Sequence, residues 1–327
     1  MIEQALSRSP VEQVDSPPTN PQEGLDSPNS SISQSEFRIP ETISELTDRF
    51  LNVPISKRIQ DWADLSADVW RGWFQQESLA AGLQARQANF DEKVEGVSII
   101  WNDGLFGWRG SEFLTKLNRF NPPAKRLFEG TYHGPIEFFQ SKGYRVREVS
   151  GRFGLQTGDL AGTSRRLEEV VDEELYYSDL VAVIGHSFGS MVGHDYAARH
   201  PDKAEMIMFI SGGAPYFPWD VNFWIAGSFL AINGTSGFDR LCENARFMQS
   251  AQALKIRFVN IVDSDDRVVD GPKAPGETRL TSTGHTGVYF DEGNLDFADS
   301  QIKSELARRR SGKGFNSLIP TLSNTAA

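Results

Sequence analysis

Leu180-Val-Ala-Val-Ile184 runs directly into Gly185-His-Ser-Phe-Gly189, and a helical pattern follows as far as His200. The five apolar residues predict a buried strand, and the Gly-x-Ser-x-Gly motif after them is typical of a sharp turn from a strand into a helix. A side chain in place of either glycine would collide with the facing backbone. The turn therefore presents the Ser187 hydroxyl at the carboxyl edge of a sheet, above a helix N-terminus that favours negative charge. The alternative is a tight turn with an inert serine.

The chain from Val97 onward alternates between short β-rich runs and longer amphipathic segments. This alternation predicts an α/β fold with a mainly parallel, doubly wound sheet and helices on both faces. Helical patterns lie between most of the runs, as in Gly162–Leu175 and Phe188–His200. The six expected strands are Val97–Trp101, Tyr144–Val149, Leu180–Ile184, Met206–Ile210, Ile256–Val262 and Arg279–Thr283.

The segments around this sheet differ from it in composition. Residues 1–36 hold eight Ser and five Pro and no aromatic residue, which predicts a disordered N-terminal arm. Apolar residues recur at helical spacing within 37–95, which predicts two or three extra N-terminal helices packed on the main domain. That domain is expected over 96–310, and the tail 311–327 is weakly patterned.

The composition of the 327 residues excludes several classes of protein. A net charge of −11 argues against a nucleic-acid binder, which needs a basic face. The single cysteine, Cys242, excludes an intramolecular disulfide and a zinc cluster built on thiolates. No stretch predicts a membrane span, and the N-terminus lacks a secretory pattern. We therefore expect a cytoplasmic protein without cofactor or metal ion, while peripheral membrane contact and the oligomeric state stay open.

A catalytic serine needs a base to remove its proton and an acid to orient that base. In a doubly wound sheet with the order nucleophile, acid, base, the histidine follows the last strand. Of the five histidines only His285 lies there, and the alternative for it is an ordinary surface-loop histidine. The other four lie before the serine turn, within it or on the helix after it, and are His133, His186, His194 and His200.

The acid is expected directly after the strand Ile256–Val262. Asp266 is the preferred candidate, because the apolar pair Val268-Val269 can anchor its loop two residues later, and Asp263 is the second choice. The alternative is that the aspartates of this loop are all solvated or cap the next turn. The four competing residues are Asp263, Asp265, Asp266 and Asp270.

Four segments together carry a family resemblance. They are Gly104-Leu-Phe-Gly-Trp108, Tyr132-His-Gly-Pro135, Gly185–Gly189, and Asp266-Arg-Val-Val269 with Gly284-His285. Over residues 96–305 the chain resembles the α/β-hydrolase superfamily and, within it, the bacterial triacylglycerol lipase and esterase family. This resemblance implies a nucleophile, an acid, a base and two backbone N–H donors of an oxyanion hole, which are Ser187, Asp266, His285, Leu105 and Phe188.

One departure from the family's pattern lies at the end of the first expected strand. The family usually has His-Gly there, whereas this chain has Asn102-Asp103-Gly104. An ionised Asp103 beside the oxyanion would oppose the charge that forms there, by about 3 kcal/mol at roughly 5 Å and an effective dielectric near 20. We therefore expect Asp103 to point away from the site or to pair with a cation, for which Arg109 is a candidate.

Residues 213–254 lie where this fold inserts a lid, and they are rich in aromatic residues. They are expected to form an apolar cap that lines an acyl pocket or, alternatively, core against the N-terminal helices. The expected activity is that of a serine carboxylic-ester hydrolase acting on a hydrophobic, small-molecule or lipid-like ester. The alternatives are an acyltransferase or thioesterase with the same triad, and a non-catalytic binding or scaffold protein on this fold.

Overall fold

The computed structural model of the protein describes residues 42–86, 94–102, 134–149, 159–213, 220–264, 266, 268–270 and 273–312. The expected N-terminal arm 1–36 lies outside these ranges, as does the tail beyond Gly312. Residues 103–133 also lie outside them, and this segment contains Asp103, Leu105 and Arg109.

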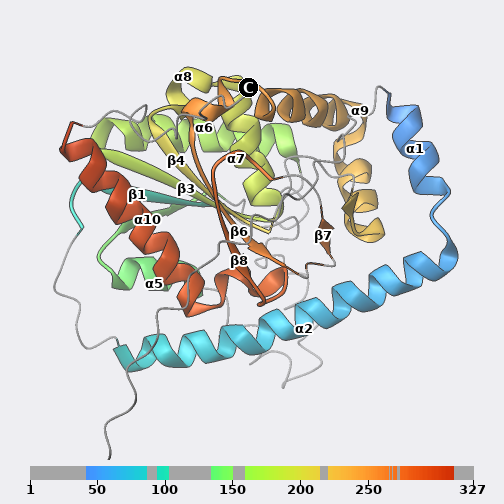
Figure 1. The fold of residues 1–327 in the computed structure, drawn as a ribbon, viewed down its shortest axis with the longest axis horizontal. Coiled ribbons are helices and arrows are strands. Elements are labelled where there is room, and N and C mark those ends of the chain that lie inside the picture. Colours follow the sequence, from blue (N-terminus) through green and yellow to red (C-terminus); the bar gives the residue numbers. More distant parts are fainter. Residues whose placement is uncertain are drawn as a thin grey trace, which may run out of the picture. The chain divides into compact units, whose positions relative to one another are not determined.

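Six parallel strands form one sheet, in the order β2-β1-β3-β4-β6-β8 (Figure 1). The order reverses between β1 and β3, because β2 lies on one side of this pair and the later strands lie on the other. The expected mainly parallel, doubly wound sheet of about six strands is confirmed. With a strand–serine–helix turn after its central strand β3, this is the α/β-hydrolase fold. The strands are β1 Val97–Asn102, β2 Arg145–Glu148, β3 Leu180–His186, β4 Ile207–Gly212, β6 Arg257–Asp263 and β8 Glu277–Thr281.

The last strand differs most from its predicted position. It covers Glu277–Thr281 instead of Arg279–Thr283. Its partner β6 ends at Asp263, which pairs with Thr281, so no strand remains to pair with later residues. The chain turns away there and leads to His285.

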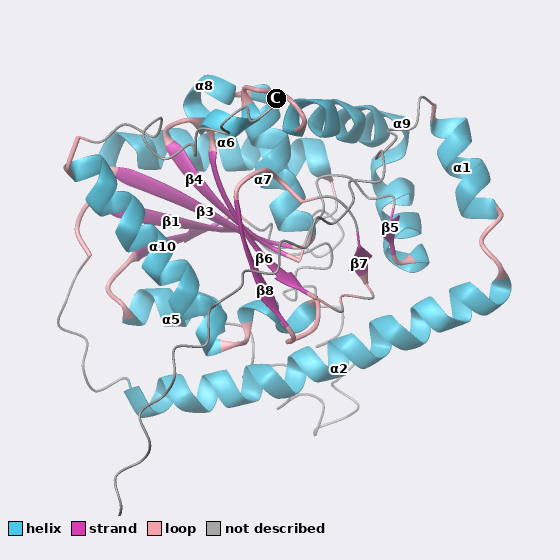
Figure 2. Ribbon diagram, viewed as in Figure 1, coloured by secondary structure: helices cyan, strands magenta, loops and turns pink. Residues whose placement is uncertain are grey.

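Helices cover both faces of the sheet (Figure 2). Strands β1, β3 and β4 are buried almost throughout, which explains why they are continuous apolar runs. Successive side chains point to opposite faces, so Ile99 joins the core beneath α5 and α10, whereas Ile100 faces the other layer. The covering helices are α5 Gly134–Ser141 and α10 Glu292–Arg310 on one face, and α6 Leu160–Tyr177 and α7 Phe188–Arg199 on the other.

Two helices, α1 (Ile43–Leu51) and α2 (Ile55–Arg86), precede the sheet. The side chain of Thr42 caps α1 by accepting the N–H of Glu45 at 3.2 Å. Along the first turns of α2 the buried side chains are polar, since Asp61 is 3% exposed while Trp62 is 57% exposed. In these first turns the apolar spacing therefore marks a helix, while polar side chains make the buried contacts.

The region 213–254 consists mainly of the helix α9 (Phe223–Met248), since residues 214–219 lie outside the described ranges. Gly234 interrupts α9 with a φ of 57°. The part after the kink is largely buried, and Arg240 there pairs with Asp195 of α7, whereas the start of α9 contacts α1 and α2 through Phe223. The remaining short elements are α8 Pro201–Ala204, β5 Asp220–Val221, η2 Ala253–Lys255, β7 Val269–Asp270 and η3 Thr286–Tyr289. None of the helices in the described ranges combines the length and the apolar character that crossing a bilayer requires.

Candidate active site

Ser187 occupies a strained turn between β3 and α7. Its φ is 51° and its ψ is −116°, and no other non-glycine residue in the described part of the chain has a positive φ. The N–H of Ser187 donates to the carbonyl of Gly212 on β4 at 2.8 Å. A Cβ on Gly185 would lie 2.5 Å from the backbone nitrogen of Ser190, which is too close for a real contact. The expected need for glycine at position 185 is therefore confirmed.

Asp266 and His285 form a buried pair. Nδ1 of His285 lies 2.9 Å from Oδ2 of Asp266, and neither side chain is more than 5% exposed. The other carboxylate oxygen accepts the N–H groups of Val268 and Val269, each at 2.8 Å. Because an ionised carboxylate only accepts hydrogen bonds, the neutral imidazole carries its proton on Nδ1, and Nε2 remains available as a base.

The pair shifts the pKa values of its two members in opposite directions. Burial disfavours the charged form of His285, but the charge and hydrogen bond of Asp266 outweigh burial and raise the pKa of His285 above its ordinary value. Burial likewise disfavours ionised Asp266, but His285 and the two backbone donors hold the pKa of Asp266 below its ordinary value. Asp266 is thus ionised at neutral pH, and an imidazolium at His285 is stabilised.

Asp263, the second candidate for the acid, contacts the histidine loop through the backbone. Its Oδ2 accepts the N–H of Gly284 at 2.5 Å. The aspartate whose side chain meets the imidazole is Asp266, so the geometry favours Asp266 over Asp263. Of the other two candidates, Asp265 lies outside the described residues, and only the backbone of Asp270 is described.

His186 links the serine turn to the histidine loop. Its Nε2 donates to the backbone carbonyl of His285 at 2.9 Å, and the two rings lie 5.2 Å apart. Burial, followed by the neighbouring His285, lowers the pKa of His186 to about 4, so this ring is a neutral donor at neutral pH. The serine motif places His186 directly before Ser187 but does not indicate this contact with His285.

A second link between the two loops runs through Gly213. Its φ is 60°, and a Cβ there would lie 2.9 Å from Nδ1 of His285, so a side chain would displace the imidazole. Gly213 directly follows Gly212, whose carbonyl binds Ser187. Ser187, Asp266 and His285 each follow the carboxyl end of a parallel strand, namely β3, β6 and β8. All three therefore come to the same edge of the sheet.

The histidines His194 and His200 lie away from this edge. His194 is buried two turns along α7, with Nε2 3.0 Å from Oγ of Ser211, and burial lowers its pKa to about 3. His200 lies beyond the far end of α7 and faces Glu168 at 3.4 Å. His133 lies outside the described residues. Across the described ranges, no three His, Cys, Asp or Glu side chains gather as a metal ion would need.

The expected oxyanion hole is described only at Phe188. This residue begins α7, so its N–H has no acceptor within the helix and lies at the positive end of the helix dipole. Leu105, the other expected donor, lies outside the described residues, and so do Asp103 and Arg109. The oxyanion hole therefore stays a prediction.

No protein-family model and no curated protein matches the chain. Solved structures similar to it include the metagenome-derived lipolytic enzymes LipS and LipT (12% identity, 65% of this chain and 96% of that chain covered, TM-score 0.44). A lipase-esterase related protein from Clostridium acetobutylicum shares 11% identity, over 65% of this chain and 96% of that chain, with a TM-score of 0.38. The Pyrococcus furiosus esterase Pf2001 shares 15% identity, over 66% of this chain and 82% of that chain, with a TM-score of 0.39.

Proposed function

We propose that this protein is a serine carboxylic-ester hydrolase of the lipase or esterase type. Ser187 is the nucleophile, His285 the general base and Asp266 the acid that orients the base. The observation that carries the proposal is the buried His285–Asp266 pair, held 2.9 Å apart at the sheet edge that bears the strained serine. The hydrogen bond from His186 to the His285 carbonyl joins this pair to the residue that precedes Ser187.

The reaction follows from the proton positions in this pair. Oγ of Ser187 attacks the ester carbonyl carbon while its proton passes to Nε2 of His285, and the carbonyl electron pair moves onto oxygen. Asp266 stabilises the imidazolium that forms. The C–O bond to the alcohol then breaks, and the alcohol leaves with the proton from Nε2. Water repeats the sequence on the acyl-enzyme and releases the acid.

The developing oxyanion is proposed to accept the N–H groups of Phe188 and Leu105. Removal of one such donor typically costs about 3 kcal/mol of transition-state stabilisation. An ionised Asp103 beside this oxyanion would cancel a benefit of that size. The proposal therefore includes an Asp103 carboxylate that points away from the oxyanion or pairs with Arg109.

The proposed substrate carries a hydrophobic acyl chain. Phe229 of α9 is buried and packs on Phe188, with the ring centroids 6.2 Å apart, so an apolar side chain of α9 packs on the residue that follows the nucleophile. Phe223, by contrast, stacks on Phe50 of α1, and its ring belongs to the contact between α9 and the N-terminal helices. The part of α9 nearer to its kink is thus the part that supports an acyl pocket.

Labelling with a fluorophosphonate probe, combined with hydrolysis of p-nitrophenyl esters of increasing chain length, tests this function. We expect labelling of wild type, loss of labelling in Ser187→Ala and a profile that peaks at a medium or long acyl chain. Ser190→Ala is the matched control, because the Ser190 hydroxyl is committed to the Gly185 carbonyl at 2.6 Å, and it should keep the label.

The outcomes separate the proposal from its competitors. Folded wild type that takes no label would overturn the hydrolase proposal and favour a non-catalytic scaffold. Labelling with turnover of acyl thioesters but not oxygen esters would instead indicate a thioesterase. A flat chain-length profile would remove the acyl pocket while leaving the catalytic proposal intact.

A further inference from the structure

The helix α2 presents a stripe of polar side chains to the histidine loop. Asp61, Asp68, Arg71 and Gln75 are spaced seven, three and four residues apart, so they share one face of the helix. At the loop, a Cβ built on Gly284 would lie 2.5 Å from Oδ1 of Asp68 and 3.2 Å from Cδ of Arg71. A Cβ on the nearby glycine at position 287 would overlap Oε1 of Gln75. Asp68, Arg71 and Gln75 therefore lie directly against the backbone that carries the base, whereas Asp61 meets the start of α9.

Asp68 is the member of this stripe that matters for the reaction. It is only 7% exposed, and Gly284, the residue that it packs against, immediately precedes His285. Gly284 has a φ of +83°, so the absence of a side chain serves both the backbone conformation and the close approach of the carboxylate. The charged and titratable groups that surround His285 are Asp266 and Asp263 from the loop after β6 and its strand end, Lys273 before β8, His186 on β3, and Asp68 and Arg71 on α2.

We propose that Asp68 is a positioning residue for the proposed hydrolase, a second carboxylate that packs beside the histidine loop and stabilises the imidazolium formed at His285 when Ser187 loses its proton. This inference rests on the proposed function. It gives the N-terminal helices, which lie outside the region of family resemblance, a direct part in the chemistry. Asp68 acts on His285 through space and does not touch the substrate.

The electrostatics of His285 agree with this assignment. After burial, which lowers the pKa of His285, and Asp266, which raises it, the next contribution is the charge of Asp68, and it raises the pKa too. Lys273 acts in the opposite direction. The carboxylates of Asp266 and Asp68 thus favour the protonated ring, and Lys273 opposes them.

The pH dependence of kcat/KM measures this effect. In Asp68→Asn the side chain keeps its shape but loses its charge, so His285 should stay neutral to lower pH and the acidic limb of the profile should move to lower pH. On the plateau, kcat should fall about tenfold with KM unchanged, because only the transition state contains the imidazolium. Asp64→Asn is the matched control, since Asp64 lies one turn away on α2 and accepts Nε2 of Gln60 at 3.0 Å. The acidic limb of this variant should coincide with that of wild type.

A merely structural role for Asp68 predicts a different result. In that case Asp68→Asn lowers the melting temperature but leaves the acidic limb in place, and this outcome overturns the proposal. Asp68→Ser is the second neutral variant should the asparagine protein not fold, and Asp68→Glu should keep the limb near its wild-type position. For each variant, circular dichroism first checks that the protein is folded, and the position of the acidic limb is then compared with that of wild type.

A second measurement separates failure of this inference from failure of the proposed function. In Ser187→Ala protein labelled with carbon-13 at the histidine rings, the His285 resonance is assigned by its loss in His285→Gln and then followed through a pH titration. With Asp68→Asn added, the titration midpoint should move to lower pH. An unchanged midpoint rejects the role of Asp68 whether or not the protein hydrolyses esters. A moved midpoint, combined with folded wild type that takes no serine-directed label, rejects only the hydrolase.

Discussion

The buried ring of His194 is expected to make the fold sensitive to acid. Burial, followed by the charge of Lys273, lowers the pKa of His194 from 6.5 to about 3. Below about pH 6.5 the unfolded chain therefore binds a proton that the folded protein does not take up until about pH 3, so stability is lost as the pH falls through this window. From this residue alone, the free energy of unfolding should decrease by about 1.4 kcal/mol per pH unit.

The variant His194→Gln isolates this contribution, because glutamine does not titrate. Urea denaturation between neutral pH and about pH 5 should give a shallower loss of stability in the variant than in wild type. His200→Gln is the control, since His200 lies at the far end of the same helix and is partly exposed. Parallel curves for His194→Gln and wild type would contradict the expected burial of a neutral ring.

Some residues of the candidate site can be predicted from the sequence, whereas others are identified only by their contacts in the folded structure. Ser187 was marked by its motif, and the order of strands placed His285 last, because both follow from local turn chemistry and fold topology. His186 and Gly213 depend instead on which loops meet at the edge of the folded sheet. Only the three-dimensional contacts identify their roles, because no motif near either residue indicates that it lies against His285.

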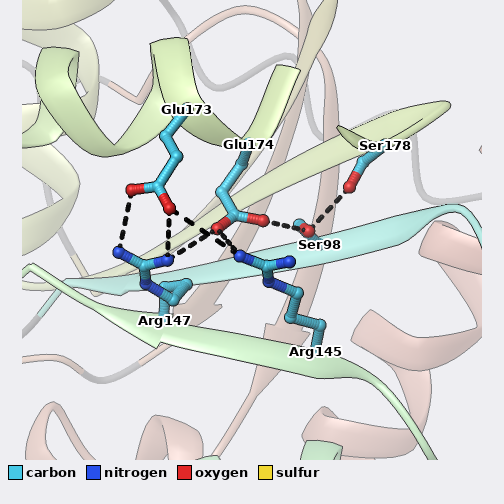
Figure 3. A network of polar contacts seen from close by, with 6 residues as sticks. All are labelled: Ser98, Arg145, Arg147, Glu173, Glu174 and Ser178. Atoms are coloured by element: carbon cyan, nitrogen blue, oxygen red, sulfur yellow. Dashed lines mark hydrogen bonds and ion pairs between the residues drawn. The ribbon is translucent and has the colours of Figure 1, made fainter. Parts of the chain in front are cut away.

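At the scale of elements, an ion network around one buried carboxylate ties the edge strand β2 to the helix α6 (Figure 3). Glu174 is fully buried, and its Oε1 lies 2.9 Å from Arg145 and 3.1 Å from Arg147. Its neighbour Glu173 is about half exposed and also meets Arg147, at 3.0 Å. The network continues on the other side of the buried carboxylate through two serine hydroxyls, those of Ser98 and Ser178.

This arrangement predicts different costs for removing two adjacent glutamates. Glu174→Ala removes the buried acceptor shared by two arginines and the Ser98 hydroxyl, and the free energy of unfolding should fall by about 2 kcal/mol, as expected for the loss of hydrogen bonds to a buried charged group. Glu173→Ala should change stability much less, because water replaces its exposed contacts. Chemical denaturation of both variants measures the difference. Equal effects of the two substitutions would mean that burial of Glu174 does not decide the strength of the network.

For α2, the sequence predicts that a helix forms but does not predict which of its side chains are buried in the first turns. Apolar spacing correctly indicated a helix, since that period is a local property of the chain. The side chains buried along it include Asp61 and Asp68, whereas Ile55 and Ile59 are 74% and 65% exposed. At Asp61 and Asp68 the main domain presents the N–H of Phe223 and the backbone of the histidine loop, and such groups favour polar partners.

At the scale of the whole molecule, contacts at the start of α9 join the N-terminal helices to the hydrolase fold. Oδ2 of Asp61 accepts the N–H of Phe223 at 2.9 Å, and the backbone carbonyl of Asp61 accepts Nδ2 of Asn222 at 2.6 Å. The N–H of Asn222 donates in turn to the carbonyl of Val268, beside the Asp266 loop, at 2.8 Å. A displacement of α2 would therefore reach α9 and the loop of the proposed acid together.

The variant Asp61→Ala tests whether these parts are one cooperative unit. It leaves the first N–H of α9 without its acceptor in a partly buried place, so the free energy of unfolding should fall by about 1 kcal/mol. Hydrogen exchange should then accelerate in the first turn of α9 and also in α2, because each element orders the other. Asp64→Ala, on the same helix but bound to Gln60, should leave the exchange of α9 unchanged. Faster exchange confined to α2 in Asp61→Ala would contradict the coupling and would make the N-terminal helices an independent appendage of the sheet.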